Sequence, residues 1–168
     1  YKIINNSKII FTVSETALHG IEKLLPKSKN NYPQIKVVYN ASQIKPLKSY
    51  SKSKSFICIT GENNQKNTNC IKNSLDYFDD SSLKGWKIYL IGLKINKTFE
   101  HSSGAKLIYR KYLDFNSILK LYEEAYCLLF PSLFESFGIP LVDAMRARCY
   151  IIASDQGSPN EICGDNGI

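Results

Sequence analysis

The sequence lacks any hydrophobic run long enough to cross a membrane, and it lacks a cysteine pattern typical of disulfides or zinc. The longest apolar stretches, 89–93 and 127–133, fall far short of the roughly 18 residues that a membrane-spanning helix needs. The five cysteines include no Cys-x-x-Cys pair and the two histidines stand alone, so a zinc site has no support. Cys58 and Cys127 lie inside apolar runs, where a reduced cysteine acts as a small hydrophobic residue. A reducing compartment is therefore indicated.

A secretion leader is also missing, because no basic and then apolar segment opens the chain. The chain begins with Tyr1 and ends at Ile168 with no closing element, so we expect a part of a longer protein. Its net charge of +7 comes mostly from scattered lysines, without a run of five or more basic residues. This charge favours phosphate-bearing small molecules or an anionic membrane surface as partners, and we expect no nucleic acid.

Strand and helix patterns alternate along the chain, whose 43% hydrophobic content is that of an ordinary globular protein. Such alternation indicates β-α-β crossovers. The predicted fold class is therefore α/β, a Rossmann-like parallel sheet with helices on both faces. Ser14 is the predicted cap of the first helix, and Asp114 or Ser117 that of a later one. Strands are predicted at 8–13, 34–39, 55–60, 86–93, 105–109, 127–130 and 150–153, with those at 8–13, 55–60, 86–93 and 127–130 expected to be buried. Helices are predicted at 15–25, 68–78, 118–125 and 138–148.

Three predicted loops follow strands and lead toward helices, at 61–67, 131–140 and 154–160. In parallel sheets, ligands bind at the carboxyl ends of the strands, where such loops gather. We therefore expect the functional residues in these three segments.

The most informative segment is F-P-S-L-F-E-S-F-G-I-P-L-V-D, residues 130–143. Pro140 suits the first turn of a helix, and Gly138 lets the backbone approach a ligand. The amides of this helix start form an anion site. Glu135 is expected on an exposed loop ahead of the helix and Asp143 one turn inside it, so the two carboxylates could hold two polar parts of one ligand. Alternatively, both are ordinary acidic residues favoured by the helix dipole.

This segment and the later I-I-A-S-D-Q-G-S-P-N-E-I-C-G-D-N-G-I resemble the retaining glycosyltransferase group 1 family, whose signature is an E-x7-E motif in P-S-x-x-E-x-F-G-x-P-x-x-E-A-M. Enzymes of this family have the GT-B architecture of two Rossmann-like domains. The resemblance covers nearly the whole chain. It implies that residues 1–40 end the N-terminal, acceptor-side domain, that 41–54 form a linker, and that 55–168 form an incomplete C-terminal, donor-binding domain.

The resemblance also implies roles for individual residues. Glu135 would be the catalytic residue, contacting hydroxyls of the transferred sugar without acting as nucleophile or general base. Asp143 would bind the nucleotide ribose, and Lys66 would supply a cation to the diphosphate. Further donor contacts would come from Gly61 and from the backbone of Phe137, Gly138 and Ile139.

The chain departs from the family pattern at three places. Asp143 stands where the second motif glutamate is usual, so its carboxylate reaches about one methylene less. Gly61 is followed by Glu62 where the family usually has arginine, which removes a positive charge near the donor. The stretch Arg146-Ala147-Arg148-Cys149 lies where a glycine normally precedes the next strand.

The implied reaction is transfer of a hexose from a nucleotide-diphosphate sugar to a hydroxyl of a saccharide or lipid-linked acceptor, with retention at the anomeric carbon. Neither a cofactor besides this donor nor a metal is expected, since the chain has no D-x-D motif. The usual setting of the family implies cell-surface polysaccharide or lipopolysaccharide synthesis in the cytoplasm, with peripheral contact at the inner face of an anionic membrane.

Alternative functions remain open at this stage. The departures at Glu62 and Asp143 both touch donor binding, so a degenerate, non-catalytic nucleotide-sugar-binding homologue is one alternative. A sugar-nucleotide 2-epimerase of GT-B fold is another, although it is not expected to carry this signature. A dinucleotide-dependent oxidoreductase would need G-x-G-x-x-G after its first strand, which the loop at 61–67 lacks.

Overall fold

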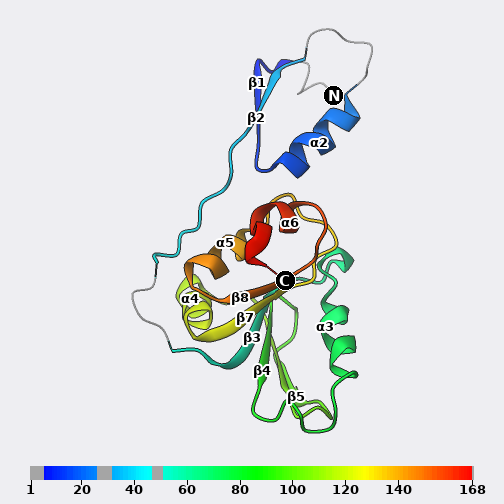
Figure 1. The fold of residues 1–168 in the computed structure, drawn as a ribbon, viewed down its shortest axis with the longest axis vertical. Helices are drawn as coiled ribbons and strands as arrows, with labels where there is room; N and C mark the ends of the chain where they lie inside the picture. The colour runs from blue at the N-terminus through cyan, green and yellow to red at the C-terminus, as the bar shows by residue number, and fades with distance from the viewer. Residues whose placement is uncertain (1–5, 26–31, 47–50, 168) are drawn as a thin grey trace.

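The computed structural model describes residues 6–25, 32–46 and 51–167, which form two parts of unequal size (Figure 1). The small lobe consists of the parallel strands β1 (Ile9–Thr12) and β2 (Gln34–Val37) with helix α2 (Glu15–Leu24). The large lobe is built on a six-stranded sheet. The polar composition of residues 27–33 predicts a loop, and this segment lies mostly outside the described residues.

The large sheet has the strand order β5-β6-β4-β3-β7-β8, and all neighbouring pairs are parallel except β5 and β6. Numbered along the chain, its parallel strands follow the 3-2-1-4-5 order of doubly wound nucleotide-binding sheets. This confirms the predicted α/β class. The strands are β3 (Ser53–Ile59), β4 (Lys87–Ile91), β5 (Lys97–Glu100), β6 (Lys106–Arg110), β7 (Ala125–Phe130) and β8 (Tyr150–Ala153).

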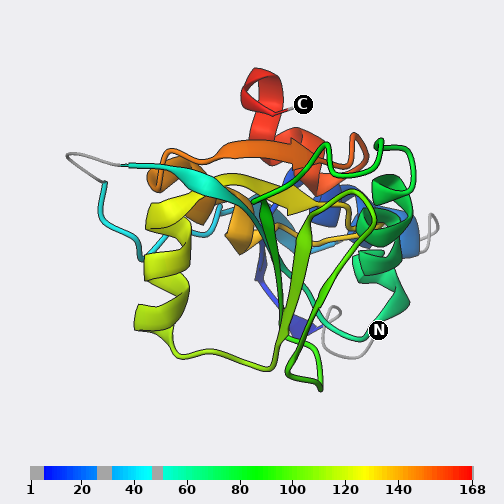
Figure 2. The same cartoon turned by 90° about the horizontal axis from the view of Figure 1, so that it is seen from below.

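Helices cover both faces of this sheet (Figure 2). Helices α4 (Phe115–Glu124) and α5 (Ile139–Arg146) lie on one face, and α3 (Thr68–Leu75) lies on the other. Each face has its own core: Ile57, Leu128 and Leu141 belong to the cluster under α4 and α5, whereas Cys58 and Leu75 belong to the cluster under α3. The remaining helical segments are η1 (Asn64–Lys66), α6 (Ser158–Cys163) and η2 (Gly164–Asn166).

Two predicted helix caps are confirmed. The Ser14 side chain accepts a hydrogen bond from the Ala17 amide at the start of α2. Of the two candidates for α4, Asp114 is the cap, because its carboxylate accepts from the Ser117 amide. No helix among the described residues is long and apolar enough to span a membrane.

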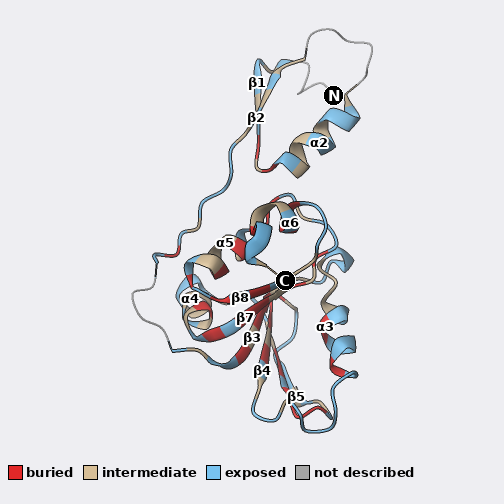
Figure 3. Ribbon diagram, in the orientation of Figure 1, coloured by how far each residue is buried: buried red, intermediate tan, exposed pale blue. Residues whose placement is uncertain are grey.

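The prediction that β1 is buried is wrong. Phe11 is 65% exposed and Ile9 is 44% exposed, and Figure 3 shows that the buried residues concentrate in the large sheet. The reason is that, among the described residues, β1 pairs with β2 alone and is packed by α2. An apolar run thus identified the strand correctly and its burial incorrectly.

One strand and one α-helix were not predicted, and several bounds differ. Strand β5 is short and has the polar sequence K-T-F-E. Helix α6 begins at Ser158 inside the predicted loop 154–160, and Pro159 fits its first turn. Helix α3 ends at Leu75, so Phe78 beyond it is 48% exposed. Strand β3 begins at Ser53, two residues before its predicted start.

Arg148 occupies a backbone conformation that glycine adopts far more readily. Its φ is 55°, in the left-handed region, where the Cβ of an L-residue costs about 1–2 kcal/mol. This residue lies in the stretch 146–149, in which the family pattern has a glycine. The left-handed turn is therefore kept here without its usual residue.

All five cysteines are free, and four are buried. Burial raises the pKa of the Cys58 thiol to about 12 and that of Cys127 to about 11. Both act as the small core residues that their apolar runs predicted. Cys70, near the start of α3, is the exposed exception.

Candidate functional site

The site lies where the chain connections of the large sheet change direction. Neighbouring strands β3 and β7 lead into helices on opposite faces, since α3 follows β3 and α5 follows β7. In doubly wound sheets, this switch point opens a crevice at the carboxyl ends of the strands, in which ligands bind. We call the place where the loop 61–67, after β3, meets the loop 131–138, after β7, the crevice.

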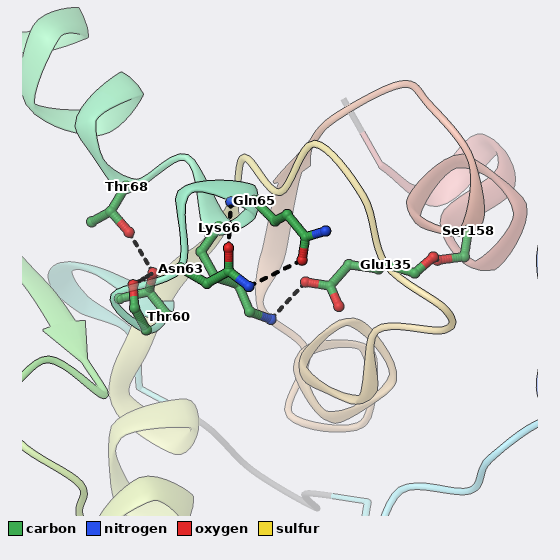
Figure 4. A network of polar contacts seen from close by, with 8 residues as sticks. Thr60, Asn63, Gln65, Lys66, Thr68, Glu135 and Ser158 are labelled. Carbon is green, nitrogen blue, oxygen red and sulfur yellow. Dashed lines mark hydrogen bonds and ion pairs between the residues drawn. The ribbon is translucent and has the colours of Figure 1, made fainter.

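Lys66 and Glu135 meet across this crevice (Figure 4). The Nζ atom of Lys66 lies 2.6 Å from Oε1 of Glu135, and the two side chains are 31% and 17% exposed. A second contact joins the loops, because the Leu133 amide donates to the Gln65 carbonyl at 2.8 Å. The loop is exposed as expected, with Leu133 and Phe134 each 61% exposed, but the Glu135 carboxylate within it is ion-paired and only 17% exposed.

The asparagine-rich sequence after β3 shapes the loop that presents Lys66. The Asn63 side chain accepts from the Gln65 amide at 3.1 Å and starts η1, at whose end Lys66 stands. Asn67 then adopts a left-handed conformation, with φ of 49°, in which asparagine is tolerated. The hydroxyls of Thr60 and Thr68 bond to each other across the base of the loop. Lys66 thus projects from a closed turn.

Two buried serines hold the backbone at Glu135. Ser158 Oγ donates to the Glu135 carbonyl at 2.8 Å, and Ser14 Oγ donates to the Ser136 carbonyl at 2.5 Å. Both serines have no exposed surface. Sequence reasoning identified Ser14 only as a helix cap and did not single out Ser158, because its partner lies 23 positions away.

The start of α5 requires the glycine that precedes it. Gly138 has φ of 101°, and a Cβ there would lie 2.8 Å from Cδ1 of Leu141. Among the described residues, no side chain caps this helix start, Pro140 has no amide hydrogen, and the Leu141 amide donates to the Gly138 carbonyl at 2.9 Å. The helix start therefore leaves the amides of Gly138 and Ile139 for a ligand. Phe137 is buried and its ring centroid lies 6.0 Å from that of Tyr39, whereas Ile139 is half exposed.

Asp143 is neither exposed nor free. Its Oδ1 accepts a hydrogen bond of 2.6 Å from Ser42, and the adjacent Ile44 is inserted into the core. Burial raises the pKa of Asp143, and the Ser42 hydrogen bond opposes that shift only in part. The predicted linker therefore docks on α5, and it contacts the carboxylate that the resemblance assigns to the ribose.

Glu62, the acid in place of the usual arginine, pairs with the loop after β4. Its Oε2 lies 2.6 Å from Lys94 Nζ, and its Oε1 accepts from the Lys94 amide at 3.2 Å. The Lys94 side chain lowers the pKa of Glu62. Gly61 borders a hollow of about 480 Å³ beside this pair, and a Cβ at Gly61 would meet no atom within 4 Å. Gly61 is thus accessible to a donor, as its predicted contact requires. A side chain at this position would also fit, so the space around it does not require glycine.

A metal-binding cluster does not occur among the residues for which the structure gives positions: no three His, Cys, Asp or Glu side chains gather there. The groups that the crevice offers a ligand are therefore an ammonium, a carboxylate and the amides at the start of α5.

Comparison with known proteins assigns the chain to a family. A sequence model described as glycosyl transferases group 1 matches residues 40–168. The chain belongs to this family. The matched range contains the whole large lobe and excludes β1, α2 and β2.

Curated and solved relatives agree with this assignment. The chain is 27% identical over 157 residues to the O-antigen chain mannosyltransferase RfbU of Salmonella typhimurium, covering 90% of this chain and 43% of that protein. It resembles the pneumococcal O-GlcNAc transferase GtfA, solved with UDP and GlcNAc, with a TM-score of 0.68 and 14% identity. It resembles TarM with a TM-score of 0.71 and 14% identity.

The structural matches cover 94% of this chain and 32% of GtfA, and 97% of this chain and 33% of TarM. At these identities the likeness concerns the fold, and it confirms the GT-B glycosyltransferase fold expected from the sequence. This group 1 glycosyltransferase chain spans less than half the length of these relatives.

Proposed function

We propose that this chain binds a nucleotide-diphosphate sugar in the crevice between loops 61–67 and 131–138. In the full-length protein, the hexose would then pass to an acceptor hydroxyl with retention at the anomeric carbon. The observation that carries the proposal is the Lys66–Glu135 pair across the switch point, beside the uncapped start of α5. A cation, a carboxylate and helix-start amides suit a diphosphate on one side and sugar hydroxyls on the other.

The chemical demand in such a transfer is charge on the leaving group. The diphosphate gains negative charge as the glycosidic bond breaks, and donors already aimed at it lower the barrier. Lys66 and the amides around Gly138 would supply this stabilisation. The Glu135 carboxylate, released from Lys66, would accept hydrogen bonds from hydroxyls of the sugar and fix its orientation.

Asp143 is proposed to bind the ribose of the donor. Because Ser42 engages Oδ1, we assign the ribose hydroxyls to Oδ2. The linker residue Ser42 would then orient the carboxylate toward the nucleotide. We propose no metal in this reaction, on the ground that the sequence contains no D-x-D motif.

The acceptor is proposed to be a saccharide or a lipid-linked saccharide. Two relatives support a role in cell-surface polysaccharide synthesis: the O-antigen mannosyltransferase above and a lipopolysaccharide outer core galactosyltransferase, WaaB, which is 18% identical with a TM-score of 0.58. The net charge of +7 is consistent with peripheral contact at an anionic cytoplasmic membrane face.

The test separates binding from transfer. Calorimetry on the 168-residue chain with UDP-, GDP- and ADP-sugars should detect weak binding of at least one donor, while the same chain should transfer no sugar. Acceptor and donor lie on opposite domains of GT-B enzymes, and a closed site is needed to hold the reacting atoms together. The full-length protein should transfer the sugar that binds.

A matched pair of variants checks the central assignment. Glu135→Gln should reduce transfer strongly, whereas Glu100→Gln, at an exposed residue of β5, should leave the rate unchanged. A full-length protein that binds donors without transferring them would favour the non-catalytic homologue. If the chain binds none of these donors, the proposal is wrong.

A further inference from the structure

The small lobe touches the large lobe directly behind the loop that carries Glu135. We propose that Ser14 and Glu161 are positioning residues: by clasping the start of α2 to α6, they fix the placement of Glu135. We call the contacts of Glu15 and Thr16 with Glu161, together with that of Ser14 with the Ser136 carbonyl, the interlobe clasp. This inference rests on the proposed role of Glu135.

Glu161 binds the start of α2 through both carboxylate oxygens. Its Oε1 accepts from the Glu15 amide at 2.7 Å, and its Oε2 accepts from the Thr16 amide at 2.9 Å and from the Thr16 hydroxyl at 2.8 Å. These amides lie in the first turn of α2, where the helix dipole favours an anion. Figure 1 shows α6 facing this end of α2. A carboxylate of the large lobe thus accepts hydrogen bonds from the first-turn amides of a helix in the small lobe.

Tyr39 links the clasp to the start of α5. The Glu161 carboxylate lies close enough to the Tyr39 phenol to raise the pKa of Tyr39. The Tyr39 ring lies against Phe137, with centroids 6.0 Å apart. Phe137 is buried and directly precedes Gly138, whose left-handed conformation begins α5. Tyr39 therefore connects Glu161 to Phe137, which directly precedes the proposed diphosphate-binding amides at the start of α5.

Two serine hydroxyls connect the clasp to Glu135 itself. Ser14 accepts from the Ala17 amide at 2.9 Å and donates to the Ser136 carbonyl, so it serves both lobes at once. Ser158 lies three residues before Glu161, nearly one helical turn away on α6, and donates to the Glu135 carbonyl. Two successive carbonyls of the loop are therefore held from α2 and α6.

This arrangement makes the loop sensitive to the position of the small lobe. If α2 moves away, Ser14 leaves the Ser136 carbonyl and Glu161 loses three donors. The loop 131–138 would keep the hydrogen bond from Ser158 to the Glu135 carbonyl and lose the one from Ser14 to the Ser136 carbonyl. A misplacement of about 1 Å at a reacting group can cost on the order of 100-fold in rate. Loosening the clasp should therefore affect turnover more than donor affinity.

The first experiment tests the clasp without reference to catalysis. Amide hydrogen exchange on the 168-residue chain should show Glu15 and Thr16 protected, and Glu161→Ala should speed their exchange by about tenfold or more, as expected for losing charge-assisted hydrogen bonds. Glu22→Ala, on the exposed side of the same helix, should not. Equal exchange in the parent and Glu161→Ala would overturn the inference.

The second experiment tests positioning in the full-length protein. Glu161→Ala and Ser14→Ala should each lower kcat by about 10- to 100-fold, while the donor KM and the calorimetric donor affinity stay within about threefold. A merely structural role would leave kcat of the folded protein unchanged. Two variants are used because either could reduce folding, which circular dichroism would reveal.

The outcomes separate this inference from the proposed function. If Glu135→Gln abolishes transfer while kcat of Glu161→Ala equals that of the parent, the clasp does not position Glu135 and the inference is wrong. If Glu135→Gln itself transfers at the parent rate, the proposed role of Glu135 is wrong. A fall in kcat for Glu161→Ala and Ser14→Ala, with donor affinity retained, would support the inference.

Discussion

Lys66 Nζ and Glu135 Oε1 lie 2.6 Å apart although the residues are 69 positions apart in the chain. The two groups that we assign to the diphosphate and to the sugar of the donor are thus each other's partner in the crevice. Binding of a diphosphate must then compete with a carboxylate for the same ammonium. This competition sets the first two predictions.

Lys66→Ala should weaken binding of the donor diphosphate. Loss of a hydrogen bond to a charged group costs about 1–3 kcal/mol, and the loss should shrink at high salt because screening weakens the parent interaction. Calorimetry at two salt concentrations measures both effects. Lys84→Ala, at an exposed residue after α3, is the matched control. If Lys66→Ala binds the donor as tightly as the parent does, another residue supplies the cation.

Glu135→Gln should have opposite effects on turnover and on binding of the free nucleotide diphosphate. Turnover should fall because the sugar loses its carboxylate partner. The diphosphate, however, should bind about 0.5–1.5 kcal/mol more tightly, since Lys66 no longer has to leave a charged partner. Calorimetry with UDP, GDP or ADP, whichever the parent binds, measures the change. Weaker binding in this variant would contradict the competition.

The Asp143 carboxylate should lower the stability of the folded protein, although we assign it to ribose binding. Its pKa is raised by burial, so the folded protein holds this proton more tightly than the unfolded chain does. Ionising Asp143 therefore costs more free energy in the folded protein than in the unfolded chain. This destabilisation of the fold is absent at acidic pH, and it grows as pH rises through the usual aspartate range and on through the raised pKa. Asp143→Asn should therefore melt at a temperature equal to or above that of the parent at pH 7, with the difference vanishing near pH 3.

The same position tests the ribose assignment. Asp143→Asn should lower affinity for the donor nucleotide, whereas Asp143→Glu, which restores the usual length of the family motif, should keep or raise it. Equal donor binding by all three forms would remove Asp143 from the donor site. Thermal melts of the variants across pH would still test the burial argument separately.

Arg148→Gly should be more stable than Arg148→Ala. The left-handed conformation at φ of 55° penalises a Cβ by about 1–2 kcal/mol, which for a chain of this size corresponds to a melting temperature higher by roughly 2–6 °C. Arg148→Ala removes the same side chain and keeps the Cβ, so it should not gain this stability. Equal melting temperatures for the glycine and alanine variants would show that the backbone conformation is not the cause.

The sequence predicted the elements of the large sheet well because their apolar runs are long and their turns are marked. It also predicted Lys66 and Glu135 separately, each from its own motif. Their pairing could not be predicted, because it depends on β3 and β7 being neighbours in the sheet. The second role of Ser14 depends in the same way on the placement of α2, which local spacing does not contain.

Burial of the four core cysteines has a practical consequence for experiments. Thiol reagents attack the thiolate, and burial both shields Cys58 and Cys127 and raises their pKa values to about 12 and about 11. An alkylating fluorophore added at neutral pH should therefore label Cys70 selectively. This residue follows the Lys66 turn on α3, so the native chain carries a single attachment point for a dye beside its proposed donor crevice, without any engineered cysteine.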